Sequence, residues 1–362
     1  MKIGIIGCRG IPNHYGGFEQ FAEFLSLGLN KPGVEVWVYN SHNHPFKGNL
    51  WNNIHIIHCY DPEDKIGTAG QFIYDLNCIL DSRKRQFDCI LQLGYTSSSV
   101  WNWLLPKKPA IITNMDGIEW KRSKYSPMVR KFLKYAEKLA VRSSDTLVAD
   151  SQAIADYLKT AYNHESVFIP YGAVIFDNPE ASFLTEFKVE PEKYFLLIAR
   201  LQPDNHVEEI IKGVIGSGTD FPLLVVGNFN NKFGNYLVNK YQSPVIRFCG
   251  SIFELKILDN LRFFSALYFH GHSAGGTNPS LLEAMAASSV ICAHNNPFNR
   301  SVLGENGFYF DDESDISSII RSGNFRAEKQ IFVPNNLKSI ENQYSWEKIT
   351  HAYHQLFIEN CK

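Results

Sequence analysis

The sequence predicts an α/β protein with two successive doubly wound domains, and three observations support this prediction. The chain has 362 residues, which is long for a single hydrophobic core. Short β-branched runs alternate with longer segments of helical periodicity, as in βαβ units with a parallel sheet. The alternation restarts beyond the Pro-Tyr-Gly at 170–172. We therefore expect an N-terminal domain at 1–172 and a C-terminal domain at 173–344, facing each other across a cleft.

In the first half, each apolar run is followed or preceded by a helical segment. KIGIIG is the first expected strand, and GFEQFAEFLSLGLN follows its glycine-rich turn with apolar residues at helical spacing. The further strands are expected at 34–40, 53–60, 87–94, 109–117 and 145–151. Further helices are expected at 72–85 and 125–143.

The second half repeats this rhythm. Its expected strands lie at 194–200, 221–227, 245–250, 266–271 and 289–294, with helices between them. Open parallel sheets bind ligands beyond the carboxyl ends of their strands. The residues that follow these strands are therefore the first candidates for a site.

Composition and charge exclude several classes of function. The formal charge of -2 implies no general attraction to nucleic acid. The seven cysteines form no CxxC pair, so we expect reduced thiols rather than a disulfide framework or a zinc site, and we expect no metal. No apolar stretch approaches the roughly 20 residues of a membrane span, and the N-terminal run is too short for a signal peptide. We expect a cytoplasmic protein whose membrane contact, if any, is peripheral.

The turn GCRGIPNHYGGFE follows the first strand. Three glycines in GIIGCRG resemble the spacing of a dinucleotide fingerprint, but the second strand ends in Asn40 rather than in the acidic residue that binds a ribose. The missing acidic residue argues against a binding site for NAD. Gly16 and Gly17 directly precede a helix, where backbone amides suit a phosphate or a sugar oxygen. A plain surface turn is the alternative.

The strand YFLLIAR ends in Arg200, at the sheet edge where a ligand is expected. A guanidinium held there could bind a diphosphate through its planar fork. An ion pair with a surface carboxylate is the alternative that the sequence leaves open.

The stretch SAGGTNPSLLEAMA joins a polar loop to a helix. Pro279 occupies the first helical turn, a favoured place for proline. Backbone amides and the helix dipole at such a start attract anions and hydroxyl oxygens. The loop residues at this helix N-terminus are Gly275, Gly276, Thr277 and Asn278. Glu283 lies about one turn inside the helix, where its carboxylate could hold the two hydroxyls of a ribose or merely complement the dipole.

Two carboxylates follow a strand of the first half, in NMDGIEWKRSKYS. Asp116 and Glu119 lie at the carboxyl end of that strand, where either could activate or position an acceptor hydroxyl. Turn and helix-capping roles are the alternative.

A basic segment comes next in the chain. Residues 120–142 hold eight Lys or Arg and one Glu. Such a segment could lie on an anionic membrane leaflet, with Trp101 and Trp103 as interfacial anchors. A solvated helix face is the alternative.

Together these motifs resemble those of retaining GT-B glycosyltransferases of family 4. The shared features are two doubly wound Rossmann-like domains, an N-terminal Gly-Gly loop, a strand that ends in arginine and a late LLEAMA helix. GCRGIPNHYGGFE, NMDGIEWKR, GGTNPSLLEAMA and AHNNPFNRSVLG further resemble bacterial rhamnosyltransferases that build surface polysaccharides. The resemblance covers nearly the whole chain, and it implies that a final helix at 345–362 packs on the N-terminal domain.

The resemblance implies a role for each candidate residue. Arg200 would contact the donor diphosphate, and Glu283 would hold the nucleotide ribose. The amides of 276–278 would face the diphosphate or the transferred sugar. The backbone at Ser251 and Ile252 would lie beside the base.

Two positions depart from the pattern of the wider family. Gly275 stands where that family has a glutamate that contacts a donor sugar hydroxyl. Asn205 stands where it often has a lysine, and His206 lies beside it. The chain therefore lacks one positive contact to the diphosphate, and its sugar pocket differs in shape.

The resemblance implies a retaining glycosyltransferase that moves rhamnose from dTDP-rhamnose to a growing glycan, in capsular, exopolysaccharide or O-antigen synthesis. The acceptor would be linked to a polyprenyl diphosphate at the inner face of the cell membrane. The nucleotide-sugar is the substrate, and no cofactor is expected. The alternatives are a family 4 enzyme that uses a UDP-hexose and a non-catalytic protein of the same fold that binds nucleotides or glycans.

Overall fold

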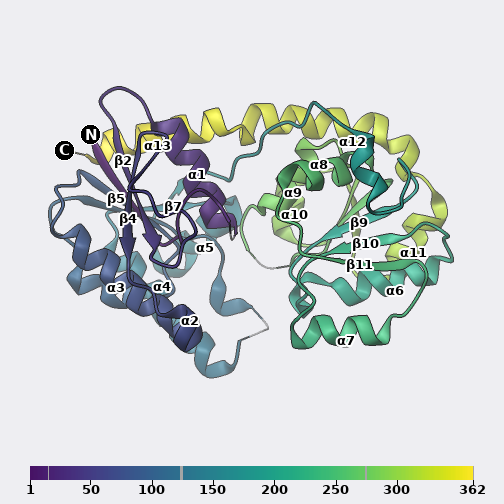
Figure 1. Cartoon of the computed structure of the whole chain (residues 1–362), viewed down its shortest axis with the longest axis horizontal. Coiled ribbons are helices and arrows are strands. Elements are labelled where there is room, and N and C mark those ends of the chain that lie inside the picture. Colours follow the sequence, from purple (N-terminus) through teal and green to yellow (C-terminus); the bar gives the residue numbers. More distant parts are fainter. Residues whose placement is uncertain (15, 123–124, 274, 362) are drawn as a thin grey trace. The chain divides into compact units, whose positions relative to one another are not determined.

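The computed structural model describes residues 1–14, 16–122, 125–273 and 275–361. The chain divides into two compact units (Figure 1). Unit 1 comprises Met1–Tyr171 and Trp346–Lys362, and unit 2 comprises Gly172–Ser345. Each unit has its own sheet of mainly parallel strands.

Unit 1 is built on an eight-stranded sheet of order β3-β4-β2-β1-β5-β6-β7-β8. Neighbouring strands are parallel, except that β3 pairs with β4 in the antiparallel sense. The strands are β1 (Lys2–Ile6), β2 (Glu35–Ser41), β3 (Leu50–Trp51), β4 (Ile54–Cys59), β5 (Cys89–Leu93), β6 (Ala110–Asn114), β7 (Thr146–Ala149) and β8 (Val167–Phe168). The central strands are buried on both faces, as a parallel sheet between two helical layers requires.

Helices cover both faces of this sheet, with α1 and α13 on one side and α3 and α4 on the other (Figure 1). The helices of unit 1 are α1 (Gly17–Leu29), α2 (Glu63–Ile66), α3 (Gly70–Ser82), α4 (Pro127–Ser143), α5 (Gln152–Tyr162) and α13 (Trp346–Asn360). Short 3-10 turns are η1 (Gly67–Ala69), η2 (Ser99–Leu104) and η3 (Glu119–Lys121). Serine caps fix where α4 and α5 begin, because Ser126 and Ser151 each accept from a backbone N–H of the first turn.

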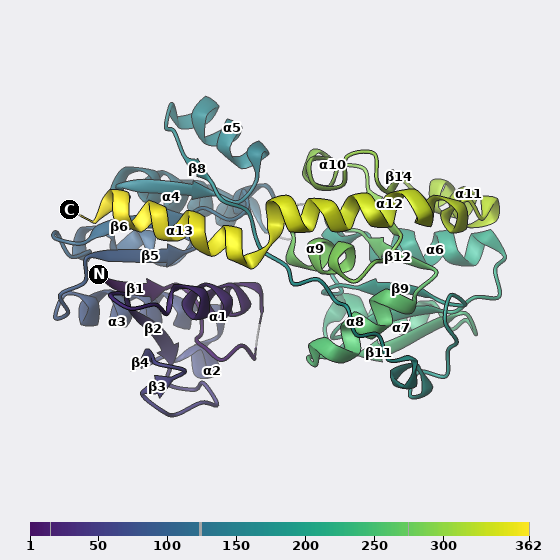
Figure 2. The same ribbon diagram turned by 90° about the horizontal axis from the view of Figure 1, so that it is seen from above.

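The C-terminal helix α13 belongs to unit 1 and packs against α1 (Figure 2). The indole of Trp346 stacks on the ring of Phe24, with centroids 4.8 Å apart. Gly28 lets the two helices approach closely, since a Cβ atom at this position would lie 2.5 Å from Thr350 Oγ1.

The expectation that all seven cysteines are free thiols is wrong for one pair. Cys89 and Cys361 form a disulfide, with their Cα atoms 6.1 Å apart. They are 272 positions apart in the sequence, so only the packing of α13 on unit 1 brings them together. The other five cysteines are free, and all of them except Cys249 are buried.

Unit 2 is built on a six-stranded parallel sheet of order β11-β10-β9-β12-β13-β14. The strands are β9 (Phe195–Ile198), β10 (Leu223–Val226), β11 (Ile246–Gly250), β12 (Leu267–His270), β13 (Ile291–His294) and β14 (Phe308–Phe310). The first strand of unit 2, β9, lies between β10 and β12, so the strand order reverses there. This reversal is the topological switch point, beyond which open α/β sheets bind their ligands.

Helices also cover both faces of the second sheet. In Figure 1, α8, α9 and α12 lie on one side, and α6, α7 and α11 on the other. The helices of unit 2 are α6 (Val207–Ser217), α7 (Lys232–Lys240), α8 (Leu255–Phe264), α9 (Pro279–Ala286), α10 (Pro297–Leu303), α11 (Glu313–Ser322) and α12 (Phe325–Ser339). The 3-10 turns η4 (Ala181–Thr185) and η5 (Pro203–Asn205) and the π-helical turn η6 (Ile340–Tyr344) complete the unit.

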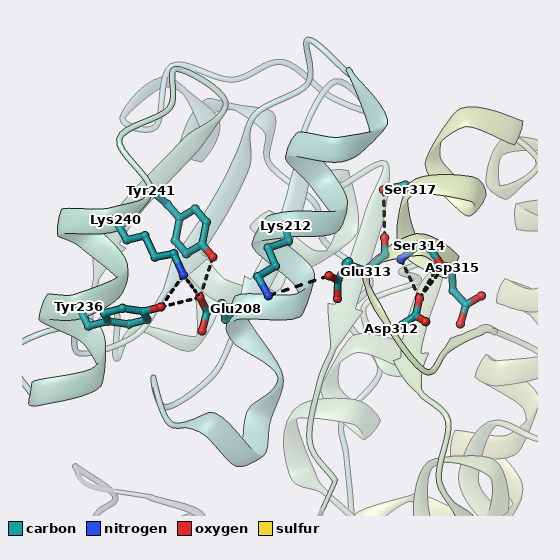
Figure 3. A network of polar contacts seen from close by, with 10 residues as sticks. All are labelled: Glu208, Lys212, Tyr236, Lys240, Tyr241, Asp312, Glu313, Ser314, Asp315 and Ser317. Carbon is teal, nitrogen blue, oxygen red and sulfur yellow. Dashed lines mark hydrogen bonds and ion pairs between the residues drawn. The ribbon is translucent and has the colours of Figure 1, made fainter.

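A polar network on the outer side of unit 2 joins α6 to α7 (Figure 3). Glu208 accepts hydrogen bonds from the hydroxyls of Tyr236 and Tyr241, at 2.8 and 2.7 Å, and from Lys240 at 2.8 Å. Burial alone would raise the pKa of Glu208, but the hydrogen bonds from Lys240 and the two tyrosines lower it to about 2. The carboxylate is therefore charged at neutral pH and fastens the two helices together.

The two sheets confirm the predicted fold class, an α/β protein with doubly wound units. Each expected strand is present, and the structure adds β3, β8 and β14. These three strands have two, two and three residues, which is too short for a periodic pattern to reveal. Within the part of the chain that the structure describes, no helix combines the length and the apolar character of a membrane span.

Asp75 of α3 is a buried carboxyl group whose protonation should affect stability. Ser97 Oγ donates a hydrogen bond to its Oδ2 at 2.6 Å. Burial raises the pKa of Asp75 to about 7, although the hydrogen bond from Ser97 opposes this rise. The native state then holds a proton that the unfolded chain releases above about pH 4, so stability is lost as the pH rises from there through about 7.

We therefore expect the substitution Asp75→Asn to stabilise the protein at about pH 8 by about 1 kcal/mol or more, and to have little effect at about pH 4. The reason is that the amide needs no proton to stay neutral. Urea unfolding of both proteins at the two pH values measures the difference. An equal change in stability at both pH values would show that Asp75 is not the titrating group.

Candidate functional site

The candidate site of unit 2 lies at the carboxyl ends of β9, β12 and β13, which are neighbouring strands. The loop after β9 carries Arg200 and Asn205, and the loop after β12 carries Gly275–Asn278. These two loops are far apart in the sequence, and the parallel sheet places them at one edge. That edge includes the topological switch point.

Arg200 is the second residue after β9, and its side chain is exposed. No residue that the structure describes forms a hydrogen bond or ion pair with its guanidinium. The backbone there is held by Asn205, whose buried side chain donates from Nδ2 to the carbonyl O of Arg200 at 2.7 Å. Asn205 therefore braces the loop, and the guanidinium of Arg200 can turn to a ligand.

The loops after β9 and β12 are tied to each other. Ser273 Oγ donates to the carbonyl O of Asp204 at 2.8 Å. His206 Nδ1 donates to the carbonyl O of Gly271, also at 2.8 Å. Gly271 permits this approach, because a Cβ atom there would lie 2.0 Å from the carbonyl O of Asn205. The contacts fix both loops at the switch point.

The helix α9 begins with Pro279 in its first turn, as the sequence predicts. Asn278 caps the helix: its Oδ1 accepts from the N–H two residues later at 3.0 Å. Gly275 has a φ of +126°, which residues with a side chain rarely adopt. Gly276 is half-buried and Thr277 is buried. This loop therefore keeps small residues in front of the positive end of the helix.

Glu283 belongs to a buried ion-pair network that sequence reasoning missed. Arg262 of α8 is 1% exposed; its guanidinium lies 2.8 Å from Asp259 Oδ1 and pairs with Glu283 Oε2. One turn before Glu283, Ser280 Oγ lies 2.7 Å from the hydroxyl of Tyr268. Glu283 thus has a specific partner beyond the helix dipole, and Arg262 fixes the orientation of its carboxylate.

Two asparagines of the AHNNPFNR stretch were also missed. Asn296 and Asn299 each donate from Nδ2 to the carbonyl O of His272 at 3.0 Å. Asn299 also donates to the carbonyl O of His294 at 2.9 Å, and Asn296 caps α10. These contacts join the loop after β12 to the end of β13. The only local sign of these roles in the sequence was Asn296 directly before Pro297, a pattern that is typical of a helix start.

Ser251 and Ile252 follow β11, which is the edge strand and lies two strands from β9. Ser251 is exposed and Ile252 is half-buried. Both residues therefore lie at the same carboxyl edge as Arg200, on its outer side.

In unit 1, buried polar side chains hold the glycine-rich turn after β1. Glu19 Oε1 accepts from Arg9 N at 2.7 Å. Asn40 accepts from the N–H of Ile11 at 3.1 Å and donates to its carbonyl O at 2.8 Å. Asn40 thus binds its own turn at the place where a dinucleotide site has a ribose-binding carboxylate, which agrees with the argument against NAD.

Gly16 and Gly17 form the start of α1. Gly16 is the N-cap residue and has an extended backbone, with a φ of −168°. No side chain among the described residues caps this helix. The hydroxyl of Tyr171 donates to the carbonyl O of Gly17 at 2.7 Å, so the end of unit 1 holds the start of α1 in place.

Asp116 and Glu119 differ in their surroundings. Asp116 has a φ of +48°, and its N–H donates to Asn114 Oδ1 at 2.9 Å. Glu119 Oε1 forms an ion pair with Arg122 at 2.8 Å, and the hydroxyl of Tyr125 lies 3.4 Å from its Oε2. A backbone in the left-handed region is frequent at functional sites. The structure places both carboxylates beyond the end of β6, and both remain candidates for contact with an acceptor.

Glu137, the one acidic residue of the basic segment, is buried among tyrosines. It accepts from the hydroxyls of Tyr157 and Tyr162 at 2.6 and 2.5 Å. The hydroxyl of Tyr95 lies 3.3 Å both from Glu137 and from the carbonyl O of Gly117. This carboxylate therefore ties α4 to α5 and to Tyr95 after β5, a role that the sequence did not reveal.

The basic segment 120–142 is not one continuous helix. It contains η3, and α4 begins only at Pro127, because Ser126 has an extended backbone and caps the helix. The exposed side of α4 and the neighbouring Trp103 of η2 together form a surface that we call the α4 surface. It consists of Trp103, Met128, Lys131, Phe132, Lys134, Tyr135 and Lys138. Trp101 does not belong to it, since its indole N–H donates to the carbonyl O of Phe72 inside unit 1.

A family model described as a domain of unknown function (DUF1972) matches residues 104–174. The sequence matches none of the curated proteins with which it was compared. Solved structures match along the whole chain. Sucrose-phosphate synthase from Thermosynechococcus elongatus superposes with a TM-score of 0.79 at 15% identity, covering 99% of this chain and 98% of that chain.

Two further structures are similar over their full length. HepE from Anabaena, solved in complex with UDP and glucose, has a TM-score of 0.77 at 14% identity, covering 99% of this chain and 100% of that one. A glycosyltransferase from Rickettsia africae has a TM-score of 0.71 at 14% identity, covering 100% and 98%. The chain therefore has the GT-B fold.

Proposed function

We propose that this chain is a retaining glycosyltransferase that moves a sugar from a nucleotide donor to a glycan acceptor. The observation that carries the proposal is the carboxyl edge of the second sheet. Arg200 is exposed there at the switch point, and the next strand leads into the N-terminus of α9, which carries Glu283. The GT-B fold supports the class of reaction, since solved glycosyltransferases share it.

In this proposal the residues of unit 2 bind the donor. Arg200 and the N-terminus of α9 stabilise the charge that develops on the diphosphate as its bond to the sugar breaks. Glu283 accepts hydrogen bonds from the ribose, with its carboxylate oriented by Arg262. The small residues 275–278 let the diphospho-sugar approach the backbone, and Ser251 and Ile252 lie beside the base.

In this proposal unit 1 contributes residues from two places, the start of α1 and the loop after β6. Gly16 and Gly17 offer backbone amides to an anionic part of the substrate. Asp116 positions the acceptor hydroxyl, while Glu119 stays paired with Arg122. The acceptor attacks on the face from which the diphosphate leaves, and the departing diphosphate takes the acceptor proton. The sugar keeps its anomeric configuration because the acceptor attacks on the same face that the diphosphate leaves, without an enzyme nucleophile.

The proposed donor is dTDP-rhamnose, on the strength of the four sequence motifs. Gly275 supports a sugar with fewer hydroxyl contacts, since it offers no carboxylate to a hydroxyl of the donor. A 6-deoxyhexose also presents a methyl group, which favours an apolar wall. A UDP-hexose is the second candidate, and the HepE structure with UDP and glucose supports it.

The test is a thermal-shift screen with dTDP, UDP, GDP and NAD, followed by mass measurement of a product. We expect a nucleoside diphosphate to stabilise the protein, and its sugar to be transferred equally well in the presence of EDTA. Stabilisation by NAD alone would overturn the proposal. Nucleotide binding without turnover on any acceptor would favour the non-catalytic alternative.

The proposed acceptor is linked to a polyprenyl diphosphate, which would place the protein at the inner face of the cell membrane. The α4 surface supports peripheral contact. Met128 is 82% exposed and Trp103 is 70% exposed, beside the exposed lysines of α4. Large apolar side chains among cations are typical of surfaces that bind the boundary of an anionic bilayer.

We therefore expect the protein to sediment with vesicles that contain anionic lipid at low salt, and to be released as salt is raised. The double substitution Lys131→Glu and Lys134→Glu should weaken binding about tenfold or more, since each cation near the surface contributes about 1 kcal/mol. Lys232→Glu on α7 of unit 2 is the matched control. Failure of the unmodified protein to bind anionic vesicles at low salt would exclude this contact.

A further inference from the structure

We infer that His206 is a second positively charged contact to the donor diphosphate, in place of the lysine that the chain lacks at position 205. This inference rests on the proposed function. It concerns one residue for which sequence motifs suggest no role, and it follows from how the structure holds that residue.

The backbone at His206 is unusual for the start of a helix. His206 is the N-cap residue of α6, yet its φ is +48° and its side chain makes no capping hydrogen bond. Asn, Asp, Ser or Thr in an extended conformation is preferred at this place. The imidazole instead bonds the carbonyl O of Gly271, from the end of the neighbouring strand. The start of α6 therefore lacks a favourable capping residue and has an imidazole at the switch point instead. A residue held in such an uncommon backbone conformation is typical of functional sites.

The position of His206 suits a diphosphate. It lies on the short loop that begins at Arg200, and its bond to Gly271 bridges the ends of β9 and β12. The bond from Asn205 to the carbonyl O of Arg200 holds the two ends of this loop together. A ligand that meets the guanidinium of Arg200 beyond β9 therefore also meets the region of His206 and the N-terminus of α6.

The ring of His206 is held on both sides. Its Nδ1–H is committed to the carbonyl of Gly271, so Nε2 can donate to a phosphate only when the ring takes up a proton. The ring stacks on His294, with centroids 3.9 Å apart. Burial, and then the neighbouring His206, lower the pKa of His294 to about 4, so His294 is neutral and does not repel a charged His206.

The other charged groups near this pair lie on two loops. Asp204 lies on the same loop as His206 and is buried, and Arg200 begins that loop. Asp311, after β14, acts electrostatically on His294. An arriving diphosphate brings two or more negative charges to the loop that carries the guanidinium of Arg200.

The experiment compares nucleoside diphosphates with their nucleosides. The affinities of UDP, dTDP, uridine and thymidine are measured for the unmodified chain, His206→Asn and His206→Lys. Asparagine tolerates the left-handed backbone and is a good N-cap, so His206→Asn removes the imidazole with little cost to the fold. His351→Asn, at an exposed position of α13, is the matched control.

We expect His206→Asn to weaken binding of UDP and dTDP about tenfold or more, the loss expected for one hydrogen bond to a charged group. Binding of the nucleosides should not change, and His206→Lys should restore most of the affinity. Unchanged binding of the diphosphates, or an equal loss for the nucleosides, would overturn the inference. If Arg200→Ala weakens UDP binding and His206→Asn does not, only this inference fails. If the unmodified chain binds neither diphosphate, the proposed function fails with it.

Discussion

Replacing Arg200 with alanine is expected to lower the rate of sugar transfer about 100- to 1000-fold, the loss typical of removing one group that stabilises a developing negative charge. The guanidinium is exposed at the end of β9, and no described residue pairs with it. The loop backbone is held by Asn205 rather than by the arginine side chain. The substitution should therefore leave the melting temperature almost unchanged. It removes only the positive charge that stabilises the leaving diphosphate.

Steady-state kinetics with a nucleotide-sugar donor measure this effect, with thermal unfolding as the check on the fold. Arg200→Lys keeps the positive charge but loses the planar fork. Its rate of sugar transfer should therefore lie between the rates of the unmodified protein and of Arg200→Ala. Arg321→Ala, on α11 of the same unit, is the matched control. Turnover close to that of the unmodified protein in Arg200→Ala would remove Arg200 from the mechanism.

Replacing Arg262 with methionine is expected to destabilise unit 2 by about 3–5 kcal/mol, the cost of breaking a buried ion pair by removal of one partner. Arg262 is 1% exposed and contacts both Asp259 and Glu283. Its removal leaves two acidic groups close together without their cation. It also removes the cation that orients the carboxylate of Glu283, so nucleotide binding should weaken in whatever protein remains folded.

Urea unfolding measures the loss of stability. The second variant combines Arg262→Met with Asp259→Asn and Glu283→Gln, which removes the unpaired charges together with the cation. This triple variant should recover much of the stability but none of the nucleotide affinity, because an amide cannot replace the carboxylate. A loss below about 1 kcal/mol in Arg262→Met would show that the network is not a structural element of unit 2.

Much of the fold was predictable because its signals are local. Strands such as Phe195–Ile198 are continuous apolar runs, and α1 has apolar residues at helical spacing. The start of α9 was predictable from Pro279 and the glycines before it. The beginning of α4 was misplaced by two residues, since the basic composition of the segment continues across the serine cap.

The candidate site was predictable only in part. Arg200 and the loop before α9 stand out because they follow apolar runs that end at the ligand-binding edge of a sheet. Asn205 stands out only as the position where the wider family often has a lysine, and the structure adds that its buried amide is bonded to the carbonyl O of Arg200. Arg262 was missed because an arginine in an amphipathic helix usually points to solvent. Asn299 was missed because its partners lie on two other loops.

The sequence by itself determined the order and type of the elements, the break between two doubly wound halves and the small polar loop that starts α9. These features depend on side-chain periodicity and on the backbone preferences of glycine and proline, which act over a few residues. Only the tertiary structure decided that Arg262 orients Glu283, that His206 bridges two strand ends and that Cys89 meets Cys361. Such pairings join residues far apart in the chain, and they exist only once the parallel sheets bring distant loops to a common edge and α13 returns to unit 1.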